Sequence, residues 1–385
     1  MARRKRRLPG VGPVEPGPSR EPMAGTSPQP GAPLHGSPTW GPGQGAPGES
    51  PAATDRRGRA LRDLRVSVTD RCNFRCTYCM PRDVFGPGFE FVPREELLTF
   101  EEIQRVASLF VRLGVEKVRI TGGEPLLRRE LERLVAMLAE LEGVRDLTMT
   151  TNASLLPGRA EALRDVGLRR VTVSLDALDD EVFRAMSDVN LPVSRVLEGI
   201  DAASDAGLTP VKVNMVVKRG ANDHQVERMA AHFRGTGHIL RFIEYMDVGS
   251  TNGWRMEDVV PASEIHRRIH ERWPLEPMEP DYPGEVATRY RYRDGAGEVG
   301  IISSVTRPFC ATCTRARLTA DGELFTCLFA ADGHGLKDLL RSGASDDEIL
   351  QRVRGIWEHR DDRYSELRTE ATSPLPRVEM SRIGG

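Results

Sequence analysis

Six short runs of mainly β-branched and apolar residues alternate with longer stretches of helical periodicity, and this alternation limits the fold more than any other feature. The helical stretches include Thr99–Leu113, Arg129–Leu141 and Ser194–Ala206. Strands separated by helices of this length form parallel βα units, so the sequence predicts an α/β fold with a barrel of parallel strands. The six predicted strands are Leu64–Val68, Lys117–Thr121, Leu147–Thr150, Arg170–Leu175, Val211–Val217 and Ile239–Ile243.

The alternation fails after about Met246. The following residues combine a helical pattern at Ala262–Arg272 with Pro-rich connections and a strand-like piece at Gly300–Val305. We therefore predict a barrel domain over residues 59–249 and a C-terminal α+β extension over 250–385 that closes the barrel mouth. In barrels of parallel strands the chemistry lies at the carboxyl ends of the strands, where we expect the functional motifs.

Composition separates an N-terminal tail from this folded part. The first 50 residues contain 11 Pro and 10 Gly and show no periodic apolar pattern. Such a segment buries too little apolar surface to offset its ordering entropy, so residues 1–58 are predicted to be disordered. The tail is rich in Arg, as mitochondrial presequences are, but its Pro and Gly content argues against an amphipathic helix.

Charge and hydropathy exclude several other classes of protein. The net charge of −2 does not indicate a nucleic-acid binder, and a small anionic substrate would need a local basic pocket. The sequence has no run of about 18 consecutive apolar residues, so it predicts no transmembrane helix. The six cysteines form two tight groups of three, which indicates metal or iron–sulfur ligation in a reducing compartment such as the cytoplasm.

The first cysteine group, Cys72-Asn-Phe-Arg-Cys76-Thr-Tyr-Cys79, directly follows the first predicted strand. Three thiolates on one loop can hold three corners of a four-iron cluster, and the missing fourth cysteine leaves one iron open to another ligand. A zinc site is the alternative, but structural zinc takes four protein ligands and no histidine is near in sequence.

The second group is Cys310-Ala-Thr-Cys313 followed by Cys327. His334 could complete a Cys3His zinc site, so the spacing leaves zinc and an iron–sulfur cluster both open. Because the chain has no further cysteine, a cluster here would also have an open iron that a substrate could reach.

Two arginines, Arg315 and Arg317, lie between Cys313 and Cys327. They are two positions apart, so in an extended segment both side chains face the same side. Two guanidinium groups beside a cluster suit a phosphate-bearing substrate, and a solvated basic strand is the alternative.

A C-x3-C-x2-C loop after the first strand of a βα barrel resembles the signature of radical SAM enzymes. The resemblance implies an incomplete (βα)6 TIM-like barrel whose open iron chelates S-adenosylmethionine (SAM), and one electron then releases a 5′-deoxyadenosyl radical. It also implies that Tyr78 lies near the adenine of SAM. The loop Thr-Gly-Gly-Glu-Pro at 121–125, with Gly123 and Glu124, is implied to bind the SAM amino group.

Residues 61–385 as a whole resemble the GTP 3′,8-cyclase family of molybdenum cofactor biosynthesis. The shared marks include both cysteine triads, Thr-Arg-Ala-Arg at 314–317, Asp-Asp-Arg-Tyr at 361–364 and the terminal Gly384-Gly385. The resemblance implies two 4Fe-4S clusters, the second binding the guanine of GTP. It implies removal of hydrogen from C3′ of GTP, attack of the C3′ radical on C8, and a reduction that gives (8S)-3′,8-cyclo-7,8-dihydroguanosine 5′-triphosphate.

The resemblance also assigns roles to single residues. The Gly-Gly tail is implied to enter the active site, and Arg382 is expected to approach it. The implied SAM contacts are Tyr78, Gly123, Ser174 and Met246. The implied GTP contacts are Arg65, Arg119, Thr150, Lys212, Arg315, Ala316 and Arg317. The cluster ligands are Cys72, Cys76 and Cys79 for the first cluster and Cys310, Cys313 and Cys327 for the second; the first three join Arg315 and Arg317 as the catalytic set.

The implied partners are GTP, a reductant such as flavodoxin or ferredoxin, cyclic pyranopterin monophosphate synthase as the next enzyme, and a second copy in a homodimer. One residue departs from the family: Ala153 follows Thr-Thr-Asn where Gly is common, which questions a turn after the third strand. Two other functions stay open, namely a radical SAM maturase of peptides or proteins with an auxiliary cluster, and a non-catalytic iron–sulfur sensor.

Overall fold

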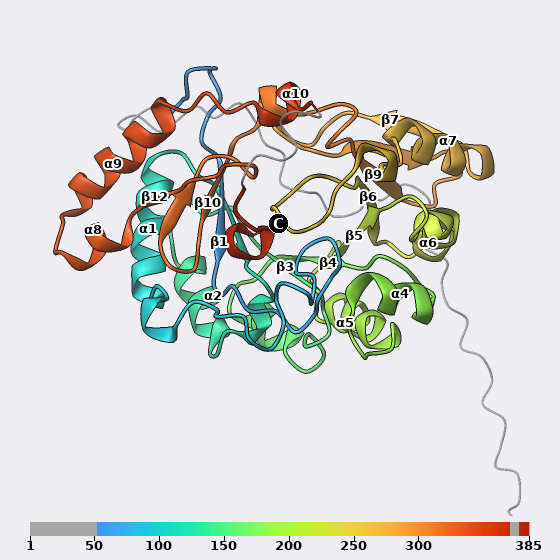
Figure 1. Ribbon diagram of the computed structural model, residues 1–385, viewed down its shortest axis with the longest axis horizontal. Helices are drawn as coiled ribbons and strands as arrows, with labels where there is room; N and C mark the ends of the chain where they lie inside the picture. Colours follow the sequence, from blue (N-terminus) through green and yellow to red (C-terminus); the bar gives the residue numbers. More distant parts are fainter. Residues whose placement is uncertain (1–51, 370–376, 385) are drawn as a thin grey trace, which may run out of the picture. The chain divides into compact units, whose positions relative to one another are not determined.

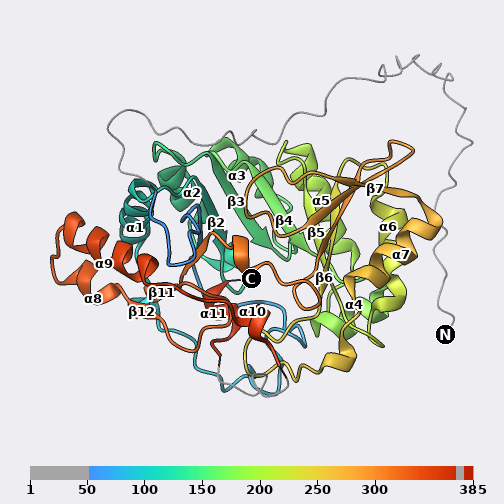
Figure 2. The same cartoon turned by 90° about the horizontal axis from the view of Figure 1, so that it is seen from above.

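The computed structural model describes residues 52–369 and 377–384, which form one twelve-stranded sheet with helices on its outer side (Figures 1 and 2). Six strands run parallel, each paired with the next in chain order. These strands are β1 (Asp63–Ser67), β2 (Lys117–Thr121), β3 (Asp146–Thr151), β4 (Arg170–Ser174), β5 (Lys212–Val217) and β6 (Ile239–Glu244). The helices between them are α1 (Phe100–Arg112), α2 (Leu131–Ala139), α3 (Ala160–Asp165), α4 (Asp180–Ser187), α5 (Ser194–Asp205) and α6 (Val226–Phe233).

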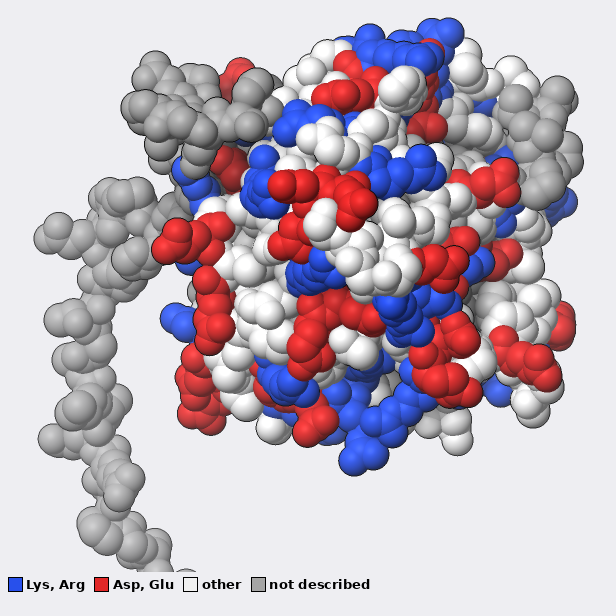
Figure 3. Space-filling model, turned by 90° about the vertical axis from the view of Figure 1, so that its left-hand side faces the viewer, with Lys and Arg blue, Asp and Glu red and all other residues white. Residues whose placement is uncertain are grey.

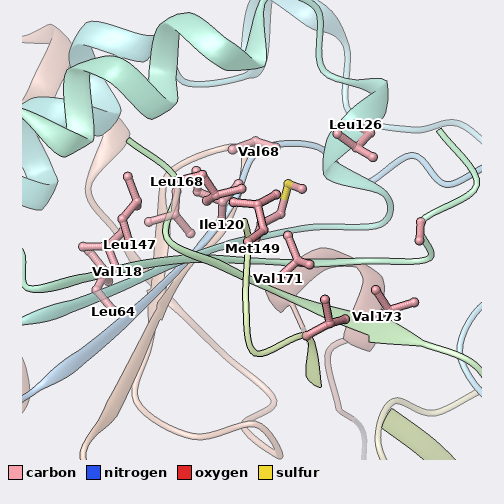
Figure 4. Close-up of a cluster of buried hydrophobic side chains, with 14 of the residues drawn as sticks. Leu64, Val68, Val118, Ile120, Leu126, Leu147, Met149, Leu168, Val171 and Val173 are labelled. Atoms are coloured by element: carbon pink, nitrogen blue, oxygen red, sulfur yellow. The ribbon is translucent and has the colours of Figure 1, made fainter. Parts of the chain in front are cut away.

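Alternation along each strand divides the sheet into an apolar and a polar face. Val118 and Ile120 of β2 pack with Met149 of β3 in the apolar layer (Figure 4). Lys117 and Arg119, offset by one residue, line the interior of the barrel instead. Successive side chains of a strand point to opposite faces, so the same strand supplies both the core and the site.

The C-terminal strands extend this sheet at both of its edges. At one edge β10 (Arg315–Leu318) pairs in parallel with β1, and β11 (Glu323–Phe325) and β12 (His334–Gly335) follow. At the other edge β9 (Glu298–Ile302) pairs in parallel with β6, followed by β8 (Thr288–Tyr292) and β7 (Leu275–Met278). The two edges do not pair with each other, so the barrel is incomplete, as predicted.

The predicted division at residue 249 therefore does not separate two sheets, because residues of the C-terminal part flank β1 and β6. The remaining helices are α7 (Ala262–Arg272), α8 (Lys337–Arg341), α9 (Asp346–Glu358), α10 (Tyr364–Leu367) and α11 (Met380–Ile383).

Helix α9 packs beside α1 through buried residues that include Ile349, Val353 and Trp357. Around this contact, Arg105 pairs with Asp346 at 2.7 Å and acidic and basic side chains are interspersed (Figure 3). Exposed pairs of this kind contribute about 0–1 kcal/mol each, so the apolar contact holds the helix. Within the described residues, no helix combines the length and apolar character needed to cross a membrane.

The folded part of the chain begins several residues earlier than the sequence predicted. Residues 52–58 were predicted to belong to a disordered tail, yet Ala53 is buried and its N–H donates to the carbonyl oxygen of Leu113 at 3.0 Å. Asp55 is also buried and forms ion pairs with Arg59 at 2.6 Å and Arg360 at 3.2 Å. Pairing with distant residues orders this segment, which its own composition does not indicate. Residues 1–51 lie outside the described residues.

Candidate active site

Two adjoining cavities occupy the interior of the barrel. The smaller one borders the first cysteine triad, at the carboxyl ends of the strands. The larger one extends to the second triad. The cavities share the lining residues Tyr78, Thr150, Ser174, Asp176 and Met380.

The second triad does not lie at the carboxyl ends of the strands, where we expected every motif. Cys313 precedes β10 by two residues, and β10 runs parallel to β1 with Arg315 opposite Asp63. The triad therefore lies at the opposite, amino-terminal end of the barrel. The prediction failed because the sequence does not show that a strand after this triad joins the barrel edge. The extension therefore reaches both ends of the barrel, with the second triad at the far end and residues such as Ser250 and Asp321 at the mouth.

The first triad lies on the loop after β1, and all three cysteines border the smaller cavity. The loop is turned by the N–H of Cys79, which donates to the carbonyl oxygen of Cys76 at 3.0 Å. The sulfur of Cys72 accepts from the N–H of Phe74 at 3.4 Å and from Nδ2 of Asn152 at 3.9 Å. Contacts of this kind tune sulfur ligands of iron–sulfur clusters. Three converging thiols without a fourth fit a cluster with one open iron.

The surroundings of the first triad are acidic. Burial, assisted by the Glu124 carboxylate, raises the pKa of the Cys72 thiol to about 12. Burial and the Asp176 carboxylate raise the pKa of Cys76 well above its usual value. Glu124 is buried and accepts from Oγ1 of Thr151 and the N–H of Asn152, each at 2.7 Å. Carboxylates held beside the cavity suit a cationic part of a ligand.

Two glycines allow the loop after β2 to pack against the cysteine loop. Gly122 has a positive φ of 141°, and a Cβ at Gly123 would overlap the carbonyl oxygen of Arg71. The N–H groups of Gly123 and Glu124 instead donate to the carbonyl oxygens of Thr69 and Arg71, each at 2.8 Å. We predicted that these glycines allow close approach of a ligand. Here they also allow close approach of the two loops.

The predicted SAM residues come together where the cavities meet. Tyr78 is buried and its hydroxyl donates to Oδ2 of Asp176 at 2.7 Å. Ser174 at the end of β4 borders both cavities, and Met246 after β6 borders the larger one. Burial raises the pKa of Asp176 to about 6. The sequence did not single out Asp176, although it follows a predicted strand end.

Charges of both signs lie around the second triad: guanidinium groups lie beside Cys313, whereas burial and the Asp362 carboxylate raise the pKa of Cys327 to about 12. Nε of Arg315 contacts the sulfur of Cys313 at 3.4 Å, and the N–H of Phe329 contacts the sulfur of Cys327 at 3.5 Å. Although burial alone raises it, the guanidinium groups of Arg315 and Arg360 lower the pKa of Cys313 to about 6. The two triads thus share their sulfur contacts and differ in the charge around them.

The zinc alternative for the second triad finds no support in the described part of the chain. His334, the proposed fourth ligand, is exposed in β12. Across residues 52–369 and 377–384, no three His, Cys, Asp or Glu side chains are arranged to hold a single metal ion.

Three arginines form a row across the cavity wall between the triads. Arg317 of β10, Arg65 of β1 and Arg119 of β2 occupy neighbouring register positions. Burial and the neighbouring Arg317 and Arg119 lower the pKa of Arg65 well below its usual range. Nε of Arg65 and Nε of Arg119 have no hydrogen-bond partner among the described residues.

In the described strands, the register positions of the arginine row include no carboxylate, whereas the adjacent register positions do. One step toward the second triad, Arg315, Asp63, Lys117 and Asp146 alternate in charge across the same strands. Buried like charges without counter-ions are unfavourable, and guanidinium groups bind phosphate in two-pronged geometry. The neighbouring Asp63 compensates Arg65 and Arg317 only in part, so the row suits an anion of several charges such as a polyphosphate.

Other predicted substrate residues differ in their placement. Thr150 lines the cavity and its Oγ1 accepts from Arg119 at 3.1 Å. Lys212 lies on the same face of β5 as Asn214 but outside the cavity lining, and burial lowers its pKa well below the usual value. Ala316 packs in the hydrophobic core, so its side chain does not reach the cavity.

Sequence reasoning missed two basic residues and one tyrosine that line the larger cavity. Lys117 is two positions before Arg119, and its Nζ lies 4.9 Å from the ring centre of Tyr282. Arg241 of β6 contacts Oδ1 of Asn214 at 3.0 Å. The two-residue period of polar positions in β2 and β6 could have identified Lys117 and Arg241. Tyr282 comes from an irregular connection and gave no signal.

The end of the chain enters the mouth of the barrel (Figure 1). The carbonyl oxygen of Gly384 accepts from Arg317 at 3.0 Å, and a Cβ at Gly384 would overlap Oγ1 of Thr121. Gly384 has a positive φ of 74°, so glycine suits both the backbone and the space. The other predicted tail residue, Gly385, lies outside the described residues.

Comparisons with known proteins agree with this geometry. The Radical SAM superfamily model matches residues 66–233, and the Molybdenum Cofactor Synthesis C model matches residues 238–366. The crystal structure of Streptococcus suis SuiB bound to S-adenosylmethionine has a TM-score of 0.53 at 16% identity, covering 76% of this chain and 68% of SuiB. This likeness shows the fold. Fold and family model together define a radical SAM protein.

Curated relatives identify the family within this class. A GTP 3′,8-cyclase of Acidothermus cellulolyticus is 56% identical over 356 residues, covering 86% of this chain and 98% of the relative. One of Xanthomonas axonopodis pv. citri is 52% identical over 331 residues, with the same coverage of 86% and 98%. The chain belongs to the GTP 3′,8-cyclase family.

Proposed function

We propose that this chain catalyses the cyclisation of GTP to (8S)-3′,8-cyclo-7,8-dihydroguanosine 5′-triphosphate. The observation that supports it most is the only partly compensated row of Arg317, Arg65 and Arg119 between two cysteine triads. A triphosphate supplies the anion that this row lacks. Arg241 and Lys117, on the same wall, add two more cations.

The first triad, Cys72, Cys76 and Cys79, would hold a 4Fe-4S cluster, and the adjoining Tyr78 and Ser174 would hold SAM. When bound and reduced, the cluster and SAM supply the one-electron chemistry that removes hydrogen from C3′ of the substrate. The buried Glu124 carboxylate orients a cationic group in the smaller cavity.

We infer a second 4Fe-4S cluster at Cys310, Cys313 and Cys327, which makes two in all. Arg315 stacks over Phe309 at 5.0 Å beside this triad and places a planar cation next to an apolar ring. With the triphosphate on the arginine row, the base of GTP extends toward this end of the cavity. The ribose then lies between the triads, which is where hydrogen removal must occur.

Anaerobic reconstitution of the full chain, followed by SAM, dithionite and GTP, tests the proposal. We expect about eight irons per chain and a GTP-derived product with the mass of GTP. ATP in place of GTP is the control and should give no cyclised product. About four irons with one zinc, or SAM cleavage without any GTP-derived product, would contradict the proposal.

The wider setting follows from the same proposal. The reaction needs a low-potential reductant, such as flavodoxin or ferredoxin, and a second enzyme, cyclic pyranopterin monophosphate synthase, to rearrange the product. We propose a cytoplasmic homodimer. The maturase and sensor alternatives gain no specific support, because a triphosphate site is not needed by either.

A further inference from the structure

The C-terminal segment, residues 377–384, crosses the barrel mouth between two fixed points. Arg382 forms ion pairs with Asp321 at 2.8 Å and Glu323 at 2.9 Å, at the turn between β10 and β11. On the other side, Glu379 accepts from the N–H of Ser250 at 3.0 Å, in the loop after β6. Helix α11 has only four residues. Such a short helix is not stable alone, so side-chain contacts must position it.

Asp247 makes the most buried of these contacts. Its Oδ1 accepts from Nε of Arg368 at 2.8 Å, and its Oδ2 accepts from the hydroxyl of Tyr364 at 2.7 Å. Arg377 lies 3.3 Å from Oδ2, and its NH1 donates to the backbone carbonyl of Asp247 at 2.7 Å. One carboxylate thus holds an arginine from each side of residues 370–376, the part of the chain that leads into the C-terminal segment.

The environment of this contact makes the carboxylate difficult to replace. The side chains of Arg368 and Arg377 are each 3% exposed and that of Asp247 is 1% exposed. Arg368 also lies 5.3 Å from the ring centre of Phe329. Both buried guanidinium groups contact the Asp247 carboxylate, so loss of that anion removes a counter-charge from each of them and favours their movement to water.

We propose that Asp247 is a positioning residue that fixes the C-terminal segment in the barrel mouth, with the Gly384 carbonyl on Arg317. This inference concerns the site of the proposed function and rests on it for its catalytic consequence. Asp247 itself need not contact substrate. It acts through Arg377, which begins the described segment, and thereby through the whole stretch to Gly384.

Hydrogen exchange of the reconstituted full chain tests the positioning directly. The variants are Asp247→Asn and Arg377→Gln, and the matched control is Arg267→Gln, which breaks an exposed pair with Glu271. We expect at least tenfold faster exchange at Arg382 and Gly384, whose N–H groups donate within the segment. Amides of β2 and β3 should keep the wild-type rate in Arg377→Gln, and the control should change neither region.

The catalytic readout is the amount of cyclised product per SAM cleaved. It should fall at least tenfold in Asp247→Asn and Arg377→Gln, while 5′-deoxyadenosine formation persists. Wild-type exchange at Arg382 and Gly384 in both variants would overturn the inference. So would faster exchange in β2 and β3 equal to that in the segment for Arg377→Gln. If wild type forms no cyclised product, the proposed function fails, and the exchange rates still decide the role of Asp247.

Discussion

The two cysteine triads offer nearly the same ligands at opposite ends of one barrel, yet the charges that act most on Cys72 and Cys313 have opposite sign. Near the first triad, Glu124 and Asp176 are buried beside the cavity, and the pKa of Cys72 is raised to about 12 by burial and Glu124. Near the second, Arg315 and Arg360 outweigh burial and lower the pKa of Cys313 to about 6. The cysteine spacing indicates clusters, but the neighbouring charges decide what each end can bind.

Carboxylates beside Cys72 and Cys76 and guanidinium groups beside Cys313 thus give the two ends of the cavity different electrostatic environments. The arginine row lies between the ends, so an anion bound there must extend toward one triad with the rest of its molecule. Exchanging the charges at the two ends would remove the site even if all six cysteines remained.

The largest expected effect separates the two triads by function. Cys76→Ser should abolish both 5′-deoxyadenosine and the cyclised product, because it removes a ligand of the first cluster. Cys310→Ser should lower the cyclised product by more than about a thousandfold while SAM cleavage continues, because only substrate binding is lost. Chromatography of both products from one reaction provides the measurement. Persistent SAM cleavage in Cys76→Ser would contradict the division of roles.

The next effect concerns the arginine row. Arg317→Met removes one charge-assisted contact of about 1.5–3 kcal/mol, so kcat/KM for GTP should fall by about 10- to 100-fold. Stability without ligand should fall by no more than about 0.5–1.5 kcal/mol, the contribution of the lost hydrogen bond to the Gly384 carbonyl, since burial and the neighbouring Arg315 already lower the pKa of Arg317 to about 10. Arg291→Met, at an exposed pair with Glu276, is the control. Steady-state kinetics and a melting curve distinguish a substrate contact from a structural one.

A smaller effect appears in protein without clusters. Because Arg315 and Arg360 outweigh burial and lower the pKa of Cys313 to about 6, iodoacetamide at pH 7 should modify it at least tenfold faster than Cys72. The thiolate also stabilises the fold at high pH, since its unfolded pKa is about 8.5. That contribution is lost as the pH falls from about 8.5 through about 6. Equal rates for Cys313 and Cys72, by mass spectrometry from pH 5 to 9, would remove the electrostatic contrast.

The smallest effect is expected at Ala153, on the side of the first triad. Ala153 is buried with a positive φ of 60°, which costs an alanine about 1–2 kcal/mol. Glycine removes this strain but loses about 0.5–1 kcal/mol through backbone entropy. Ala153→Gly should therefore change the free energy of unfolding by less than about 1 kcal/mol in urea titration. A larger loss would show that the methyl group contributes to packing near Asn152.

Local pattern was sufficient to predict much of the fold. The ranges Lys117–Thr121 and Ala262–Arg272 match β2 and α7 because each is bounded by clear turn residues. The sequence also questioned the turn at Ala153, and in the structure Ala153 itself has a positive φ of 60°. The strands β7, β8 and β10 were not predicted, because their stability depends on partners distant in sequence.

The site was harder to predict where the pairing register of distant strands decides which side chains become neighbours. The three arginines of the row become neighbours only because β10 pairs with β1, a contact that neither sequence segment reveals. For the same reason the second triad was expected at the wrong end of the barrel. The role of Asp247 was not predicted, since its arginines come from the last part of the chain.

The pairing of β1 with β10 and of β6 with β9 has a consequence for the order in which the protein is made. Both outer strands of the six-stranded unit emerge from the ribosome long before the strands that cover them. Until then each presents unpaired backbone groups, which invite association with other chains. A nascent chain that stops before β9 would hold a complete first triad between two open edges. Assembly of the barrel is thus a late event of synthesis, because it must wait for β9 and β10.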